Sequence, residues 1–304
     1  MKVTNIPFMA MRKIVAAFSL VLILISLGSL ATKGLQFGLD FTGGTLIEVA
    51  YEEAPKLDDV RALLAENGYT DVVVQNFGSP TDVVVRMANS YTPTLGDEVL
   101  STLQNHGETN VSLQRSEFVG AQVGEELREQ GGLGMLLALA IVMIYVAVRF
   151  QFKFSVASVA ALIHDVIITL GFFSLFEVEF DLTVLAALLA VVGYSLNDTI
   201  VVCDRIRENF RIMRDTTPFD LVNESINQTL GRTLITSLTT LFVLVVLFVA
   251  GGEAIHNFSM ALLVGIVIGT YSSIFVAANL LLGMNVTRED LMPTPKEELE
   301  DDMP

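Results

Sequence analysis

The sequence predicts a polytopic α-helical membrane protein with one small α+β domain between its first and second spans. Hydrophobic residues make up 52% of the 304 residues, and the mean hydropathy is +0.58. A chain of this length and composition is too apolar for a soluble domain. Six apolar runs are each about long enough to cross a bilayer as a helix. They are 14–31, 133–148, 156–176, 182–202, 234–250 and 258–282.

The first run raises the question of a signal peptide. Arg12 and Lys13 precede it, and Ser29-Leu30-Ala31 at its end is similar to a cleavage site. Its apolar core is longer than the usual signal-peptide core of about 7–15 residues. We therefore expect an uncleaved first span.

The basic residues predict the orientation of the chain. With the N-terminus in the cytoplasm, 12 of the 18 Lys and Arg residues lie on the cytoplasmic side, and the short outer loops 177–181 and 251–257 contain none. This is the positive-inside pattern. It predicts a cytoplasmic N-terminus and first span (1–31), an outer domain (32–131), five further spans (132–286) and an acidic cytoplasmic tail (287–304).

The outer domain carries 6 basic and 16 acidic residues over 33–131, and its patterns alternate between strand and helix. Turn signals at Gly68, at Gly78-Ser79-Pro80 and at Gly107 separate the runs. The expected strands are 45–51, 72–77, 82–87 and 111–118, and the expected helices are 57–67 and 95–106, with 119–130 as a helical connector. The order β-α-β-β-α-β is the ferredoxin-like arrangement. His106 is expected to cap a helix end.

Composition excludes several classes of function. The net charge of −16 argues against nucleic-acid binding, which needs a basic surface. A single cysteine, Cys203, excludes an internal disulfide and is expected to be inert packing. The acidic tail is expected to be solvated. No catalytic cluster or cofactor motif is present, so the sequence predicts a protein that is not an enzyme and holds no cofactor or metal.

Asp198 is the residue that most needs an explanation, because it lies in the fourth apolar run beside Asn197. A carboxylate in a membrane span costs at least about 2.5–3.5 kcal/mol. We expect Asp198 to point inward, with Tyr194 one turn before it. Arg232, at the start of the fifth run, is the expected counter-charge. Thr236, Thr239 and Thr240 share a helix face with Arg232 and extend this polar seam.

Two interpretations of this seam stay open. A carboxylate that alternates between a guanidinium partner and a desolvated site loads and releases protons, because its pKa changes between the two. Alternatively, Asp198 and Arg232 form a static buried pair that fixes helix register. Residues 204–211 are expected to continue the helix as a solvated extension with local ion pairs, or to dock a cytoplasmic partner.

The third run contains His164-Asp165 near its middle. Its role is open between relay and structural polar contact, since residue patterns identify no partner for Asp165. In the sixth run, Gly265, Gly269 and Ser273 have small-xxx-small spacing, which lets helices approach closely. Outside the membrane, Gly38, Asp40, Gly43 and Gly44 are expected to form a tight turn into the first strand. A phosphate cradle is disfavoured, because no helix with Lys follows.

Four motifs resemble those of the SecD/SecF family of protein translocase subunits. They are FGLDFTGG (37–44), ALIHDV (161–166), GYSLNDTIVVCDRIREN (193–209) and QTLGRTLITS (228–237). The resemblance runs from about residue 6 to about 290. It implies a six-span half-bundle of the RND transporter type in a bacterial inner membrane.

The resemblance also implies partners and a function. The partners are a separate SecD, the SecYEG channel, YajC and unfolded exported preproteins. The function is use of the proton-motive force in late protein export, with Asp198, Arg232 and Asp165 in a proton relay. A structural scaffold that carries no ions itself is the alternative. A stand-alone lipid or drug exporter is disfavoured by the small outer domain and the six spans.

Overall fold

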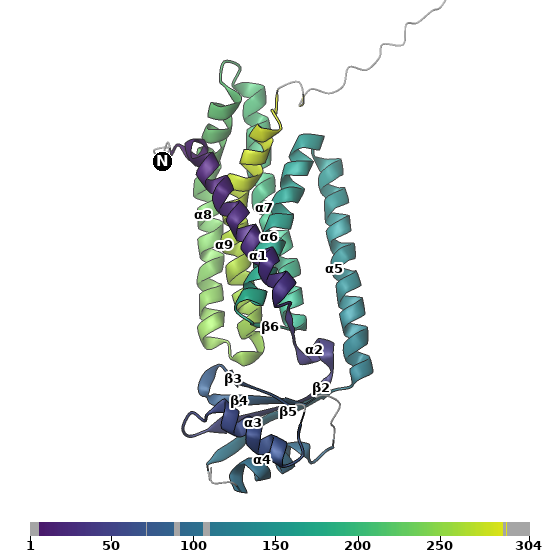
Figure 1. The fold of residues 1–304 in the computed structure, drawn as a ribbon. Coiled ribbons are helices and arrows are strands. Elements are labelled where there is room, and N and C mark those ends of the chain that lie inside the picture. Colours follow the sequence, from purple (N-terminus) through teal and green to yellow (C-terminus); the bar gives the residue numbers. More distant parts are fainter. Residues whose placement is uncertain (1–5, 71, 88–91, 106–109, 288–289, 291–304) are drawn as a thin grey trace, which may run out of the picture.

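The structure, a computed structural model, describes residues 6–70, 72–87, 92–105, 110–287 and 290. A bundle of long helices stands on a small α+β domain (Figure 1). In the described part of the chain, six helices are long and apolar enough to cross a membrane, as predicted. They are α1 (Arg12–Thr32), α5 (Ala121–Arg149), α6 (Phe152–Leu175), α7 (Leu182–Ile212), α8 (Pro218–Ala250) and α9 (His256–Gly283). A short 3₁₀ turn, η1 (Phe8–Met11), precedes α1, and another, η2 (Glu253–Ile255), precedes α9.

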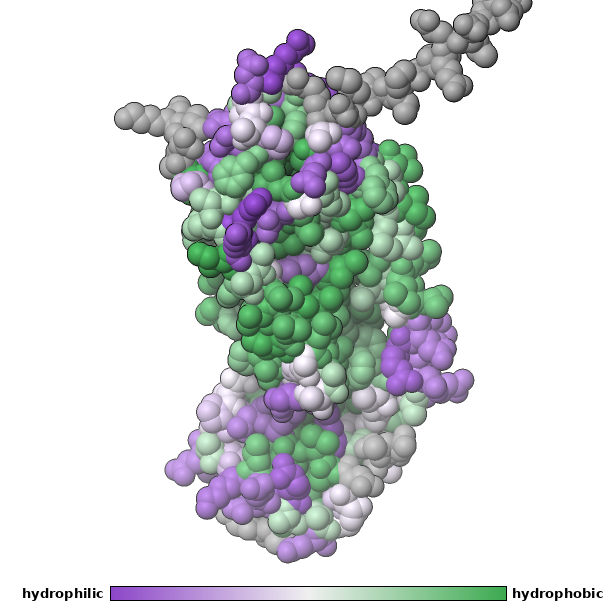
Figure 2. Space-filling model, turned by 45° about the horizontal axis from the view of Figure 1, so that its top comes forward, coloured by the Kyte–Doolittle hydropathy of each residue, from purple (hydrophilic) through white to green (hydrophobic). Residues whose placement is uncertain are grey.

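The six helices divide into an inner and an outer set. In α6, α7 and α9, between 44% and 56% of the apolar span is buried within the chain, against 6% to 17% in α1, α5 and α8. The outer helices therefore present their apolar side chains outward. On the face seen in Figure 2, a broad apolar band covers the middle of the bundle, with polar surface above and below it.

Several helices extend well beyond the apolar runs. Residues 121–130 of the expected connector 119–130 are the first part of α5, while Val119 ends β5, so one unbroken helix runs from the outer domain through the bundle. α7 and α8 continue past the apolar band as a helical pair, and the Thr217 hydroxyl accepts a hydrogen bond from the Asp220 amide to cap α8. Apolar-run length underestimates such helices, because it stops at the first charged residues.

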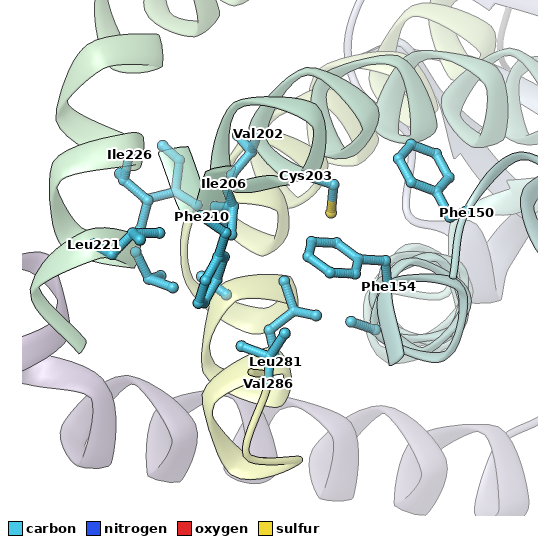
Figure 3. Packing of buried hydrophobic residues seen from close by; sticks show 14 of the residues in the cluster. Phe150, Phe154, Val202, Cys203, Ile206, Phe210, Leu221, Ile226, Leu281 and Val286 are labelled. Carbon is cyan, nitrogen blue, oxygen red and sulfur yellow. The ribbon is translucent and has the colours of Figure 1, made fainter. Parts of the chain in front are cut away.

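The end of the bundle that carries the N-terminus has its own hydrophobic core (Figure 3). Phe154, Ile206 and Leu221 are fully buried there, with Phe210 close to fully buried. The expectation of a solvated extension over 204–211 is therefore only partly right. An exposed Arg205–Glu208 ion pair is present, but every third or fourth residue of this segment packs against α8, because both helices continue together.

Two polar side chains in this region complete its packing. The Asn209 amide donates to the Ser225 hydroxyl at 2.8 Å. Cys203 is fully buried, with its sulfur 3.8 Å from the Ser158 hydroxyl. This environment agrees with the expected inert packing role of Cys203.

The outer domain has the predicted β-α-β-β-α-β order. Its elements are β2 (Gly44–Tyr51), α3 (Leu57–Glu66), β3 (Val72–Phe77), β4 (Ser79–Met87), α4 (Leu95–Asn105) and β5 (Val111–Val119). The sheet is antiparallel with order β3-β4-β2-β5, so the first strand lies in the middle, as in ferredoxin-like folds. Ile47, Val83 and Val85 of the sheet pack with Leu64 and Val99 of the two helices. His106 lies outside the described residues.

The glycine turn joins the domain to the bundle. β1 (Gln36–Phe37) pairs in parallel with β6 (Glu179–Phe180), and α2 (Leu39–Thr42) follows. The Asp40 carboxylate accepts from the Leu182 amide at the start of α7. Gly43 has φ of 66°, and a Cβ there would lie 2.7 Å from the Ala121 Cα. Only glycine fits this turn against α5.

An ion pair between Arg86 on β4 and Glu179 on β6 also bridges the domain and the bundle. Burial raises the pKa of Glu179, and the attraction of Arg86 offsets that rise only in part, while nearby Asp181 adds to it. The pKa of Glu179 is raised despite its ion pair with Arg86, because the cost of desolvating the carboxylate outweighs the attraction of the guanidinium. The predicted turn is thus a junction held by backbone pairing, close packing and one ion pair.

Candidate functional site: two buried carboxylates between the inner helices

Asp165 lies at the centre of a complete hydrogen-bond cluster. It is fully buried at the middle of α6. Its Oδ2 accepts from the Ser195 hydroxyl of α7 at 2.5 Å and from the Ser272 hydroxyl of α9 at 2.6 Å. Its Oδ1 lies 2.8 Å from Nδ1 of His164. Three inner helices therefore meet at this carboxylate, and hydrogen bonds to the charged form are what make a buried carboxylate tolerable.

Asp198 is also buried, but its environment is much less complete. Only 3% of its surface is exposed. The one hydrogen bond found for it in the described part of the chain comes from the Ser237 hydroxyl of α8, at the long distance of 3.5 Å. Ser237 itself makes a closer bond of 2.7 Å with Thr270 of α9. Asp198 is therefore inward-pointing, as predicted, without a tight partner.

α7 links the two carboxylates. Ser195, which binds Asp165, is three residues before Asp198 and lies on the same side of the helix. Thr199 bonds Ser273 of α9 at 2.8 Å. α7 and α9 come this close because Gly269 faces Ser195, where a Cβ would lie 3.0 Å from the serine Cβ. Gly265 faces Val191 in the same way. The predicted small-residue face of α9 is thus packed against α7.

The predicted Asp198–Arg232 pair is not formed. The structure has no ion pair between these two residues. Arg232 is exposed on α8 and acts on Asp198 only through space. The reason is helix phase. Ser237 faces Asp198, and five residues of an α-helix place Arg232 roughly 140° around the axis from it.

Of the threonines that share the face of Arg232, Thr236 and Thr239 are exposed and Thr240 is half-buried. Thr236 bonds back to the Arg232 carbonyl at 3.0 Å, and Thr239 bonds back to the Ile235 carbonyl at 2.9 Å. They do not contribute to the seam within this chain, which corrects the prediction. Arg232, Thr236 and Thr239 thus form an exposed polar face of α8.

Asn197 and Tyr194 have different positions. Asn197 is exposed, because adjacent helix positions are about 100° apart and Asp198 takes the inward one. Asn197 was expected to be a polar neighbour of Asp198 inside the bundle, and this expectation is wrong. Tyr194 is half-buried, and its hydroxyl lies 3.5 Å from the Ser237 hydroxyl. Tyr194 thus lies at the edge of the Asp198 site.

Sequence reasoning placed Ser195 three residues before Asp198 but missed the serines that α8 and α9 contribute to the two sites. Ser237 and Ser272 are the closest hydroxyl partners of Asp198 and Asp165 from α8 and α9. One signal was present, since Ser272 follows Gly269 by three residues and extends the small-residue face. Serine is common in membrane helices, so this signal is weak. In the part of the chain that the structure describes, no group of three His, Cys, Asp or Glu could hold a metal ion.

Six apolar helices, a small ferredoxin-like domain at one end of the bundle and carboxylates buried among the helices define a multi-pass membrane protein of the RND half-bundle class. The model for "Protein export membrane protein SecD/SecF, C-terminal" matches residues 98–287, and the SecD/SecF GG motif matches residues 28–55. The chain belongs to the SecD/SecF family.

Individual relatives agree with this assignment. The protein translocase subunit SecF of Pseudomonas aeruginosa is 52% identical over 304 residues, covering 100% of this chain and 99% of the relative. The SecF subunit of Vibrio alginolyticus is 50% identical over 307 residues, covering 99% of this chain and 97% of the relative. The crystal structure of SecDF, a translocon-associated membrane protein from Thermus thermophilus, has a TM-score of 0.85 at 38% identity. That match covers 94% of this chain and 39% of the SecDF chain.

Proposed function

We propose that this chain is a protein translocase subunit that pairs with a SecD-type subunit and couples proton movement to protein export. Its near full-length likeness to SecF subunits supports the translocase role. Its match to only 39% of a SecDF chain supports a partner that supplies the remainder. The exposed polar face of Arg232, Thr236 and Thr239, in an otherwise apolar band, is where we place that partner.

The observation that carries the coupling proposal is the environment of Asp198. It is buried, its closest hydrogen bond is long, and Arg232 is near without touching it. Because Arg232 lies about 140° around α8 from Ser237, a rotation of α8 would bring the guanidinium toward the carboxylate or withdraw it. The ionised form is favoured in the first state and the protonated form in the second. Each proton moved through the membrane potential supplies about 2.3 kcal/mol per 100 mV.

We place the protein in the bacterial inner membrane, with the N-terminus and the acidic tail in the cytoplasm. The basic residues support this orientation, because Arg149, Lys153, Arg205 and Arg211 all lie at the end of the bundle opposite the outer domain. The wider partners in this proposal are the SecYEG channel, YajC and unfolded exported preproteins. They rest on the family resemblance alone.

The test is Asp198→Asn in cells and in inverted membrane vesicles. We expect normal assembly with the partner subunit, loss of proton-dependent release of an exported protein, and loss of proton flux. Asp59→Asn, on the exposed side of α3 in the outer domain, is the matched control and should behave as wild type. Normal release and flux in Asp198→Asn, with normal assembly, would contradict the coupling role.

A scaffold role is the second candidate, and the completeness of the Asp165 cluster favours it as a source of rigidity. A scaffold predicts that Asp198→Asn is tolerated. It also predicts that bulky substitutions at Gly265 or Gly269, where α7 and α9 touch, abolish assembly. Asp198→Asn therefore separates the coupling role from the scaffold role.

A further inference from the structure

A groove of about 600 Å³ lies between α1, α6 and α9, on a different side of α6 from the Asp198 site. α1 crosses the two inner helices obliquely (Figure 1) and leaves this space beside them. The lining is mostly apolar, with a few polar side chains. The polar lining residues are Ser19 of α1, His164 of α6 and Asn279 of α9.

The groove reaches from one end of the bundle to its middle. Gly283 and Met284, at the last turn of α9, line the part of the groove nearest the N-terminal end of the bundle, where the Asn279 amide donates to the Arg12 carbonyl. His164 lines its inner part and is the thirteenth residue of α6. At 1.5 Å per residue, the imidazole is about 18 Å along the helix from the same end of the bundle.

His164 has one used and one unused nitrogen. Only 3% of the residue is exposed. Nδ1 lies 2.8 Å from the Asp165 carboxylate, whereas Nε2 is buried and has no partner among the described residues. A neutral imidazole that donates from Nδ1 to the carboxylate presents Nε2 as a bare acceptor. An unsatisfied buried acceptor at the wall of a cavity is costly unless something in the cavity donates to it.

The ring is held in this position by its neighbours. Tyr271 of α9 stacks near it with 6.1 Å between ring centroids. The Tyr271 hydroxyl is itself fixed by Ser19 at 2.8 Å and by the Val15 carbonyl at 3.0 Å. The titratable groups facing the imidazole are therefore Asp165 on its own helix and Tyr271 on α9. α1 lines the groove with no titratable side chain.

We propose that His164 passes protons from Asp165 to water in this groove, as an exit from the polar seam toward the cytoplasmic end of the bundle. This inference rests on the proton-coupled function proposed above. In the step, the O–H bond of protonated Asp165 breaks at Oδ1, and its proton forms a bond with Nδ1 of a neutral imidazole that carries its hydrogen on Nε2. The Nε2–H bond then breaks, and that proton joins a water molecule in the groove to give a hydronium ion. The ring ends neutral with the hydrogen on Nδ1, and Asp165 ends as a carboxylate.

Asp165 is suited to receive a proton from the seam and hand it to His164. Its other oxygen is bound by Ser195, which is one turn from Asp198 on α7. The route from the second carboxylate to the groove therefore follows Ser195, Asp165 and His164. Replacing His164 removes the titratable group that links Asp165 to the groove.

The test uses the full complex with the partner subunit in inverted vesicles. His164→Asn keeps an amide donor for Asp165 but has no titratable nitrogen. We expect normal assembly, proton flux lowered about tenfold or more, and loss of the pH dependence of flux between about pH 5 and 8. His164→Ala should show the same loss, and added imidazole should restore flux, whereas pyrrole, which lacks a basic nitrogen, should not.

Ala160→Leu narrows the groove without changing His164 and should also lower flux. Ala147→Leu, on the exposed side of α5, is its matched control and should have no effect. If Asp198→Asn abolishes flux while His164→Asn keeps wild-type flux and pH profile, this inference is overturned and the coupling proposal stands. If Asp198→Asn leaves flux intact, the coupling proposal itself fails.

A lipid chain is the competing occupant of the groove. It would be revealed by a co-purified lipid that Ala160→Leu releases while flux stays at the wild-type level. That result would overturn the proton-relay role of His164. A merely structural His164 predicts no rescue by imidazole and an unchanged pH profile, and it would have the same consequence.

Discussion

Asp165 and Asp198 are both buried carboxylates on inner helices, yet their surroundings differ sharply. Asp165 accepts two hydroxyl bonds of 2.5 Å and 2.6 Å and contacts His164. Asp198 has one bond of 3.5 Å to Ser237. A carboxylate with close partners on both oxygens stabilises one arrangement of the helices. A carboxylate with one long hydrogen bond and a nearby cation is compatible with two arrangements. The number of hydrogen-bond partners therefore distinguishes Asp165, which holds the helices together, from Asp198, whose surroundings can change, although both residues look alike in sequence.

The largest test of this comparison removes each carboxylate in turn. Asp165→Ala leaves two serine hydroxyls and an imidazole without their acceptor, so we expect a loss of about 3 kcal/mol in unfolding free energy. Asp198→Ala breaks only one long bond and removes a poorly paired charge, so its cost should be below about 1 kcal/mol. Unfolding in mixed micelles measures both. Equal losses for the two variants would remove the distinction.

A second test sharpens the role of close packing. Gly269→Ala places a Cβ 3.0 Å from that of Ser195 and should push α7 away from the Asp165 cluster. We expect a loss of about 1–2 kcal/mol, measured by the same unfolding assay.

Gly193→Ala is the control for this glycine. It lies on α7 with open space around it, so helix propensity alone should act there and raise stability by up to about 1 kcal/mol. A Gly269→Ala variant as stable as wild type would show that this glycine does not set the separation of α7 and α9.

A third test compares the serines. Ser272→Ala removes a 2.6 Å bond to Asp165, whereas Ser237→Ala removes a 3.5 Å bond to Asp198. Membrane hydrogen bonds average about 0.6 kcal/mol, and the better geometries are worth more. We expect about 1 kcal/mol for the first variant and a few tenths for the second. The reverse order, in the same assay, would contradict the assignment of the tighter cluster.

The smallest effect concerns a carboxylate outside the membrane, Glu179, which extends the comparison to the junction. Its pKa in the folded state is raised by burial above the ordinary 4.5. The folded state therefore binds this proton more tightly than the unfolded state does, and stability gains as pH falls through the raised pKa toward 4.5. We expect a small rise in the melting temperature of wild type over that range, and no such contribution in Glu179→Gln. A fall in wild type relative to the variant would show that the Arg86 ion pair dominates.

Sequence reasoning predicted the helices better than it predicted the site. Six apolar runs and the β-α-β-β-α-β order are local patterns, so they can be recognised from the sequence without tertiary information. Asp198 was also identifiable, because a carboxylate in an apolar run needs burial. The hydrogen-bond partner of Asp198 was not identifiable, because a shift of one residue along a helix selects a side chain about 100° around the axis. Arg232 stood out by charge, while the side chain that meets Asp198 is the unremarkable Ser237.

The same limit explains Asn197 and Asp165. Asn197 is next to Asp198 in sequence but lies about 100° around α7 from it, on the exposed surface. Asp165 had no partner that the sequence could identify, because its three contacts come from α6, α7 and α9 and two of them are serines. The hydroxyls that organise the site are visible only once three helices are placed together.

The continuity of α5 has a mechanical consequence. Its 29 residues form a rod of about 44 Å. One end is wedged where Gly124 meets Gly43, with so little space that a Cβ on Gly124 would lie 2.8 Å from the Gly43 nitrogen. A tilt of about 5° at that fulcrum would swing the far end by about 4 Å, most of a helical turn. Gly131, Gly132 and Gly134 lie in the rod and weaken it by about 1 kcal/mol each relative to alanine. The stiffness of this short stretch therefore sets how much of any rocking of the outer domain arrives at the other side of the bundle.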